Sequence, residues 1–178
     1  MGQLHHRGRS LLLWSSAACL LLLPWLAMQF TKEMAWDAGD FAIVGAMLIA
    51  VCGAYELAVR KTSNRAYLAA VAIALAAAFI LIWMNLAVGI IGSEDNPANL
   101  MYGGVLVVAI VGSLLARFRP HGMARALFAT AIAQLLVAVI AIVAGYGEAF
   151  ILTAIFMAMW LASARLFMRA QQDHSAHQ

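Results

Sequence analysis

Very few residues of this chain could carry out chemistry inside its apolar segments. Glu56, Asn85 and Gln134 lie within long hydrophobic runs, and Asp40 opens one of those runs. An ionisable group in such a run is a candidate for binding a proton or a substrate, because keeping it there costs free energy. The amides of Asn85 and Gln134 could line a polar cavity, or they could form hydrogen bonds between helices, which is their usual role.

Glu56 and Asp40 each have a structural interpretation as well. Arg60 follows Glu56 by four residues, a spacing that favours an ion pair on one face of a helix. Asp40 at the start of a helix can accept hydrogen bonds from free backbone N–H groups and complement the helix dipole. We therefore expect Glu56 to pair with Arg60 and Asp40 to cap its helix, with a transport role as the alternative for Glu56.

A further set of acids lies between the apolar runs, where Glu94 and Asp95 are neighbours. The set also includes Glu33, Asp37, Asp40 and Glu148. Carboxylate oxygens could attract cations or hold a divalent ion, although acids also collect by default on the side of a membrane that lacks arginine. Residues 93–99 are predicted to form a rigid turn, in which Asn96 is extended before Pro97.

The cysteines indicate no redox site, and the terminal histidines are expected to be solvated, with loose metal binding by His174 and His177, or by His5 and His6, as the alternative. Cys19 and Cys52 lie in apolar runs, so no disulfide is expected. A haem within the apolar segments is excluded because all five histidines lie in tails or connections, at positions 5, 6, 121, 174 and 177. No phosphate-binding glycine loop, nucleophile elbow or metalloprotease motif occurs. The sequence predicts no cofactor, no metal and no catalytic residue, and it favours a protein that is not an enzyme.

The elements that must position these residues follow from composition. Of the 178 residues, 65% are hydrophobic and 11% are charged, whereas a soluble domain has about 45–50% apolar and about 25% charged residues. A soluble core could not hide this excess, so the chain is predicted to lie in a lipid bilayer. Its 11 Lys and Arg residues are scattered, which argues against a nucleic-acid partner.

Six runs are long enough to span about 30 Å of hydrocarbon. We expect an all-α, polytopic protein with a compact six-helix transmembrane domain at residues 11–168, between tails at 1–10 and 169–178. The first run is expected to stay uncleaved, because no small-x-small site follows it. The predicted spans are 11–28, 41–59, 67–91, 100–116, 126–145 and 149–167.

The charges between the runs alternate in sign and predict the orientation. Basic residues precede the first run, follow the second, follow the fourth and accompany the end of the sixth, whereas the other connections carry most of the acids. Because basic residues in short loops stay in the cytoplasm, both termini are predicted to be cytoplasmic.

Rows of alanine at four-residue spacing predict how the helices pack. In lipid, close approach of helices depends on small residues, and we expect the helix at 41–59 to be a central, tightly packed strut. The rows are Ala38, Ala42, Ala46, Ala50, Ala54 and Ala58, then Ala66, Ala70, Ala74 and Ala78, and finally Ala154, Ala158 and Ala162.

The centre of the chain resembles a known kind of protein. The sequence NLAVGIIG at 85–92 with the turn at 93–99, followed by ARFRP at 116–120 and MARALFA at 123–129, is similar to a family of small multi-pass inner-membrane proteins of bacteria. The resemblance covers about the central half of the chain. It implies a bacterial inner-membrane location and no activity, and it carries over no functional residue.

Three functions are consistent with these observations. The favoured one is a non-catalytic accessory or assembly protein that acts through helix contacts with a membrane-protein partner or a second copy. The alternative is a small transporter or channel for a cation or small solute, using Glu56, Asn85 and Gln134. A membrane enzyme acting on lipid head groups is the least supported, because only Glu56 and the loop acids could serve it.

Overall fold

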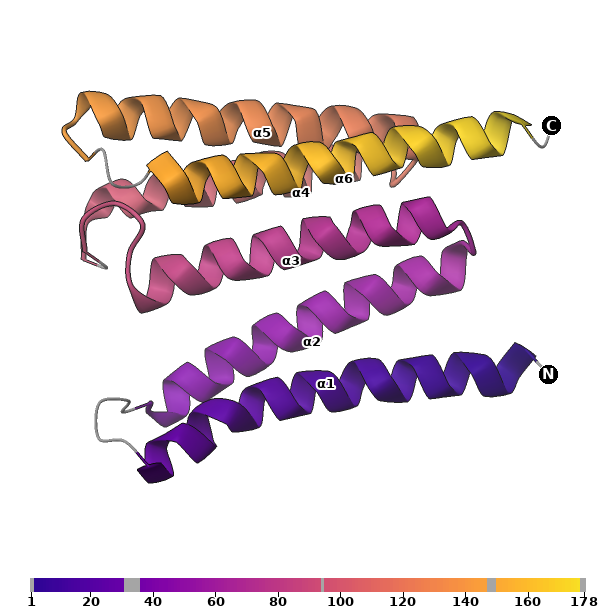
Figure 1. The fold of residues 1–178 in the computed structure, drawn as a ribbon, viewed down its shortest axis with the longest axis horizontal. Coiled ribbons are helices and arrows are strands. Elements are labelled where there is room, and N and C mark those ends of the chain that lie inside the picture. Colours follow the sequence, from indigo (N-terminus) through magenta and orange to yellow (C-terminus); the bar gives the residue numbers. More distant parts are fainter. Residues whose placement is uncertain (1, 31–35, 94, 147–149, 177–178) are drawn as a thin grey trace. The chain divides into compact units, whose positions relative to one another are not determined.

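The protein is predominantly helical in the part that the structure describes. The computed structural model describes residues 2–30, 36–93, 95–146 and 150–176. These residues form six α-helices and one short 3-10 helix, with no strand among them (Figure 1). Six helices within the described ranges are long and apolar enough to cross a membrane. The prediction of an all-α chain with six candidate membrane spans is confirmed.

The chain divides into two compact units, Met1–Lys61 and Thr62–Gln178. The first unit holds α1 (Gly2–Phe30) and α2 (Ala38–Lys61). The second holds α3 (Arg65–Ala87), η1 (Pro97–Asn99), α4 (Leu100–Leu115), α5 (Pro120–Val143) and α6 (Phe150–Ala176). The single compact bundle expected from the sequence stays a prediction.

In the first unit, α1 and α2 form an antiparallel pair (Figure 1). They approach closely at Gly45, where an added Cβ atom would lie 3.8 Å from the Leu21 side chain. The helix α1 already begins at Gly2, so the residues expected to form an N-terminal tail continue the first helix. Pro24 lies inside this helix without ending it, as is tolerated where neighbouring groups satisfy the freed carbonyl.

The alanine row of α2 does not pack as predicted. Ala42, Ala46, Ala50 and Ala54 are all exposed, whereas the buried residues of this helix are Val44, Leu48 and Cys52. On a helix of 3.6 residues per turn, the two sets point in roughly opposite directions. The alanine row is therefore not the buried face of α2, which larger side chains occupy, and the prediction that this helix is a tightly packed central strut stays a prediction.

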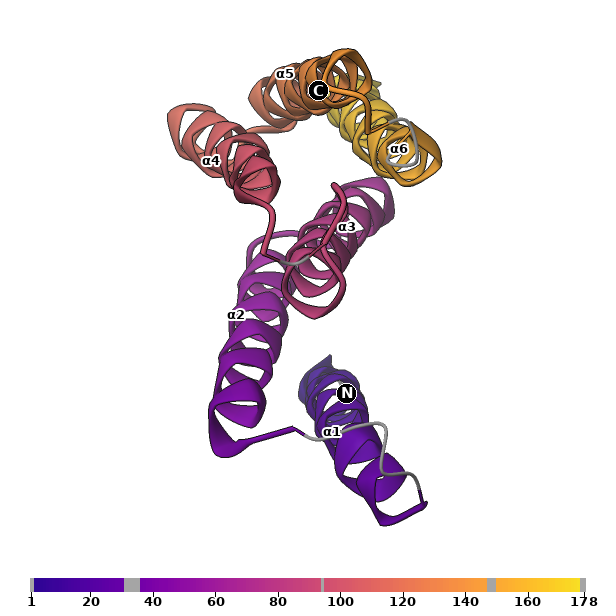
Figure 2. The same ribbon diagram turned by 90° about the vertical axis from the view of Figure 1, so that its left-hand side faces the viewer.

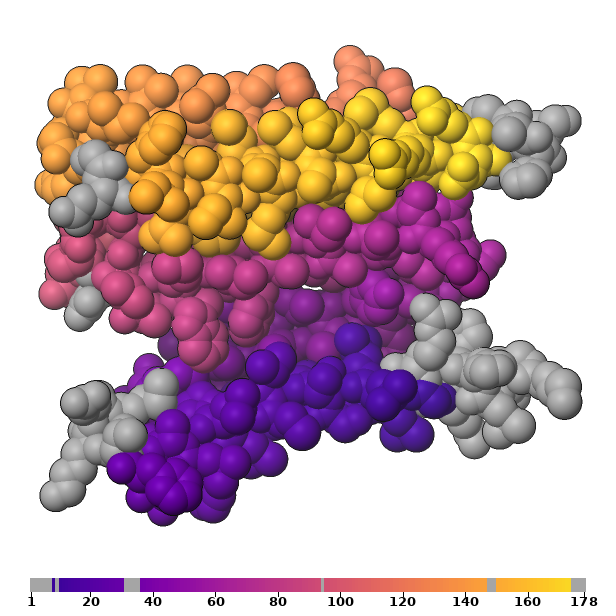
Figure 3. Space-filling model, in the orientation of Figure 1, coloured from indigo at the N-terminus to yellow at the C-terminus, as the bar shows by residue number. Residues whose placement is uncertain are grey.

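The second unit is a ring of four helices. Seen nearly along the helices, they follow the order α3, α6, α5, α4 (Figure 2). The contacts between α5 and α6, α3 and α6, and α4 and α5 are extensive, whereas α3 and α4 touch only slightly. Figure 3 shows the side chains of α6 lying against those of α3 along most of both helices.

Small residues make close packing possible in part of this ring. Ala70 is fully buried, and Ala74 and Ala78 pack against the core, as predicted for the row on α3. In α6, however, Ala158 and Ala162 are exposed, so the predicted packing of that row is wrong. The buried face of α6 is mainly aromatic and contains Phe156, Trp160 and Phe167.

Besides the start of α1, three boundaries differ from the predicted ones by four residues or more. The third helix ends at Ala87 rather than at residue 91, because Gly89 adopts a φ of 72° that a continuing helix cannot accommodate. The fifth helix begins at Pro120, six residues early, since proline is well tolerated in the first turn. The sixth continues to Ala176, through residues expected to form a C-terminal tail.

One end of the second unit gathers basic segments. The Tyr67 hydroxyl donates to the Phe118 carbonyl oxygen at 2.7 Å, and the Asn64 amide donates to Asp173 at 3.3 Å. These bonds join the start of α3 to the α4–α5 turn and to the end of α6. The same segments carry Arg65, Arg117, Arg119 and Arg169, the distribution that the sequence analysis used to predict orientation.

Candidate functional site

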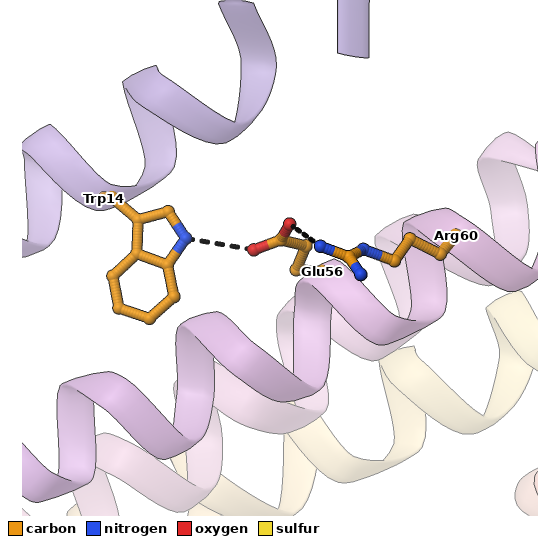
Figure 4. Close-up of polar contacts among 3 residues, drawn as sticks. All are labelled: Trp14, Glu56 and Arg60. Atoms are coloured by element: carbon orange, nitrogen blue, oxygen red, sulfur yellow. Dashed lines mark hydrogen bonds and ion pairs between the residues drawn. The ribbon is translucent and has the colours of Figure 1, made fainter. Parts of the chain in front are cut away.

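Glu56 of α2 hydrogen-bonds one side chain from each helix of the α1–α2 pair (Figure 4). The Trp14 indole Nε1 donates to Glu56 Oε2 at 3.0 Å, and an Arg60 guanidinium nitrogen donates to Glu56 Oε1 at 2.6 Å. The Glu56 side chain is only 22% exposed, whereas that of Arg60 is 67% exposed. Both carboxylate oxygens are therefore engaged, one by each helix.

Glu56 thus links α1 to α2 through hydrogen bonds. The predicted pair with Arg60 is confirmed, and it balances the carboxylate charge locally. The bond from Trp14 ties α1 to α2, a link that the sequence analysis missed. Its one visible signal was a tryptophan close to the basic end of the first apolar run, where amphipathic aromatic residues gather at membrane interfaces.

Asp37 occupies the cap position before α2, and Asp40, predicted to be the cap, is its partner at the third helical position. The Asp40 backbone N–H donates to the Asp37 side chain at 2.9 Å, and the Asp37 N–H donates to the Asp40 side chain at 3.0 Å. This reciprocal pattern is a capping box, which satisfies two backbone donors at a helix start. Asp40 is therefore committed to the helix terminus.

Among the described residues, Asn85 bonds its own helix, so an interhelical bond from this residue stays a prediction. Its Nδ2 donates to the Leu81 carbonyl oxygen at 2.8 Å, one turn earlier in α3. Its Oδ1 is buried and has no hydrogen-bond partner among the described residues. The Asn85 side chain therefore bonds a carbonyl group of its own helix, one turn away.

Gln134 is the most unusual polar residue in the second unit. Its side chain is completely buried, yet neither Nε2 nor Oε1 has a hydrogen-bond partner within the described part of the chain. The expected bond to a neighbouring helix is therefore absent from those residues. A buried amide without partners is costly, and such groups in native proteins require a physical explanation.

Trp160 of α6 shares this property and was not singled out from the sequence. It is 1% exposed, and its Nε1 likewise lacks a partner among the described residues. The available signal was its position near the middle of the sixth span, away from the interfaces that tryptophan prefers.

The other fully buried hydroxyl groups of this unit are paired. Thr130 donates to the Ala126 carbonyl oxygen at 2.9 Å, and Ser163 donates to that of Ala70 at 2.6 Å. The second of these bonds joins α6 to α3. These hydroxyl groups are thus paired, whereas Gln134, Trp160 and Asn85 Oδ1 lack partners among the described residues.

The turn between α3 and α4 is held by Asn99. Its Oδ1 accepts from the backbone N–H groups of Ile90 at 3.0 Å and Ile91 at 2.8 Å, while its Nδ2 donates to the Ser93 carbonyl oxygen at 2.7 Å. Ile90 and Ile91 belong to the buried core. Asn96 is extended and precedes Pro97 at the start of η1, as predicted, whereas the bonds of Asn99 were not predicted.

The loop acids do not form a metal site in the described ranges. Asp95 is exposed, and no group of three or more His, Cys, Asp or Glu residues that could hold an ion occurs among the described residues. Glu94, Glu33 and Glu148 lie outside the described residues. The predicted attraction of cations to these acids stays a prediction.

The six apolar helices are compatible with an integral membrane protein. Most of their polar side chains described above cap a helix or form hydrogen bonds with other residues. No protein-family model, curated protein or solved structure matches it.

Proposed function

We propose that this protein is a non-catalytic accessory or assembly protein of the membrane, and that it docks a transmembrane helix of a partner membrane protein against α2. The observation that carries this proposal is the exposed row Ala42, Ala46, Ala50 and Ala54. In lipid, an apolar surface alone gains little by association, whereas a row of small residues lets two backbones come close.

The form of this face supports a helix as the occupant. By helix geometry the row drifts about 40° per step, as expected for a four-residue repeat, so a partner helix would cross it at an angle. Ile43 and Ile49, which are also exposed, flank the alanines. Larger side chains on both sides of a row of small residues form a groove, into which a ridge of side chains on a crossing helix would pack.

The location and orientation belong to the same proposal. The resemblance of the central residues supports membership of the bacterial inner-membrane family and a place in that membrane. The gathering of Arg65, Arg117, Arg119 and Arg169 at one end of the second unit supports a cytoplasmic position for that end, and therefore for the C-terminus.

Site-specific photocrosslinking in native membranes tests the docking face. A benzophenone amino acid in place of Ala50 should give a discrete protein adduct, whereas the same probe at Ala129 of α5 should give only lipid adducts. Ala129 is the matched control, because it is an exposed alanine that lies beside the large Phe128 and Ile132. An adduct of twice the 19.1-kDa mass would identify a second copy as the occupant.

A substitution makes the test specific. Ala46→Leu should abolish the adduct formed from position 50 and leave the melting temperature of the isolated protein unchanged, because Ala46 is exposed. Ala129→Leu should affect neither measurement. If position 50 gives only lipid adducts, or if Ala46→Leu leaves the adduct intact, helix docking on this face is refuted.

Transport is the second candidate, and one observation favours a neutral solute over a cation. Glu56 is balanced by Arg60 and Asp40 is engaged in a helix cap, so these two carboxylates have little capacity for a mobile cation. Gln134 is uncharged and lacks partners among the described residues. Flux through liposomes, compared between the native protein and Gln134→Leu, tests this candidate.

A further inference from the structure

Two buried polar groups of the second unit lie at the same depth on neighbouring helices. The helices α5 and α6 run antiparallel and pack closely (Figure 1). Gln134 precedes the end of α5 at Val143 by nine residues, or about 14 Å, and Trp160 follows the start of α6 at Phe150 by ten residues, or about 15 Å. Both residues therefore lie about halfway along a span of about 30 Å.

Both residues also point toward the interior of the ring. The ten buried residues of α5 cover an arc of about 160°, from Ala126 to Ala124, and Gln134 lies at about its middle. Trp160 lies close to the middle of the narrower buried arc of α6, which Phe156 and Ser163 share. The Gln134 amide and the Trp160 indole thus both lie on helix faces directed to the interior of the ring, at the same depth.

The two groups do not hydrogen-bond each other, nor does either find another partner among the described residues. Ordered water bridges buried polar groups that face one interior without bonding each other directly. The amide offers two donors and a carbonyl acceptor, and the indole offers one donor. Thr130, one turn from Gln134, uses its hydroxyl proton on Ala126 and keeps free lone pairs.

The surroundings decide the charge of such a molecule. The buried polar side chains of the described residues carry no charge at neutral pH: they are Thr130, Gln134, Thr153 and Ser163, with the Tyr102 hydroxyl and the Trp160 indole. An ion placed here would have no counter-charge in a medium of low dielectric constant, which is prohibitively costly. A ligand must therefore be neutral, and must both donate and accept hydrogen bonds.

We propose that Gln134 and Trp160 form a buried site, halfway across the membrane, that binds a small neutral hydrogen-bonding molecule: water or a solute of similar size. The amide of Gln134 bonds the molecule as donor and acceptor, and the Trp160 indole donates to it. The site depends on the packing of α5 and α6 alone, so it stands or falls independently of docking on α2.

Nuclear magnetic resonance of the full-length, ¹⁵N-labelled protein in nanodiscs tests this site. Bound water should give magnetisation transfer to the Trp160 indole proton and the Gln134 side-chain amide protons, with Trp160→Phe used to assign the indole signal. A bound solute should instead give saturable shifts of the Gln134 amide signals when formamide or urea is added as a probe. Either result supports the proposal and identifies the source of the ligand.

Gln134→Leu supplies the decisive comparison, since an apolar side chain of similar length is well tolerated in this interior. Transfer from water to the Trp160 indole proton, or the solute-dependent shift of that proton, should be lost. Ala138→Ser, one turn away on the same buried face, adds a hydroxyl group without removing the amide and should retain the signal. The proposal is overturned if the native protein shows neither transfer nor shift, or if Gln134→Leu leaves either signal unchanged.

Discussion

Replacing Asn99 by alanine should open the turn between α3 and α4. The side chain makes three short hydrogen bonds, to the N–H groups of Ile90 and Ile91 and to the Ser93 carbonyl oxygen, together with a longer one of 3.4 Å to the Ile91 carbonyl oxygen. Each short bond contributes about 0.5–1.5 kcal/mol net, so their joint loss should lower the free energy of unfolding by about 2–4 kcal/mol.

The matched control is Asn96→Ala in the same turn. Asn96 is also an asparagine, but its side chain accepts one bond, from the Ala98 N–H at 3.0 Å, as the cap of η1. Loss of such a cap costs about 1 kcal/mol. Asn99→Ala should therefore destabilise the protein two to four times as much, by about 2–4 against about 1 kcal/mol.

Unfolding in mixed micelles with increasing SDS measures both variants, and amide hydrogen exchange locates the effect. Ile90 and Ile91 are 5% and 0% exposed, and their amides should exchange slowly in the native protein and in Asn96→Ala. In Asn99→Ala these two amides should exchange much faster. Equal destabilisation by the two substitutions, or slow exchange of both amides in Asn99→Ala, would refute the reasoning.

Three further substitutions test the packing and the polar joints. Gly112→Ala should destabilise the protein by about 1–3 kcal/mol, because the new Cβ would lie 2.8 Å from a side chain of α5. Gly103→Ala in the same helix meets open space and should be tolerated. The melting temperatures of the two variants in micelles test this difference. Ser163→Ala removes the bond to α3 and should cost about 0.6 kcal/mol and at most about 1.7 kcal/mol by SDS titration, and a larger loss would contradict a simple interhelical bond. Trp14→Phe and Glu56→Gln should each lower the yield of crosslinking between cysteines placed on α1 and α2. The double variant should lower this yield no further than the more damaging single substitution. Additive effects would show that the bond at 3.0 Å does not couple the two residues.

The spans were predictable because each depends on a continuous stretch of sequence. Hydrophobic length alone fixed the number of helices, and Gly89 marked the end of the third helix even though the predicted span ran past it. Pro120, at the start of α5, is another local signal that charge counting overlooked. The involvement of Asp40 in the start of α2 was also predictable from the sequence, because Asp40 bonds a residue only three positions away.

The packing faces were less predictable. The alanine row of α3 is packed, whereas those of α2 and α6 are exposed, although all three have the same spacing. Apolar side chains in lipid gain no transfer free energy by meeting one another. Which face becomes buried therefore depends on the shapes of both helices, and a single helix does not contain that information.

By itself, the sequence determined that the chain is helical, that it has six segments able to cross a membrane, and that Glu56 pairs with Arg60. These features depend on hydrophobic length and on neighbours within one or two helical turns. Only the tertiary structure decided that Trp14 binds Glu56, that Asn99 holds Ile90 and Ile91, and that Gln134 and Trp160 lie buried without partners among the described residues. These are relations between side chains distant in sequence or between separate helices, and they arise only when the helices have packed.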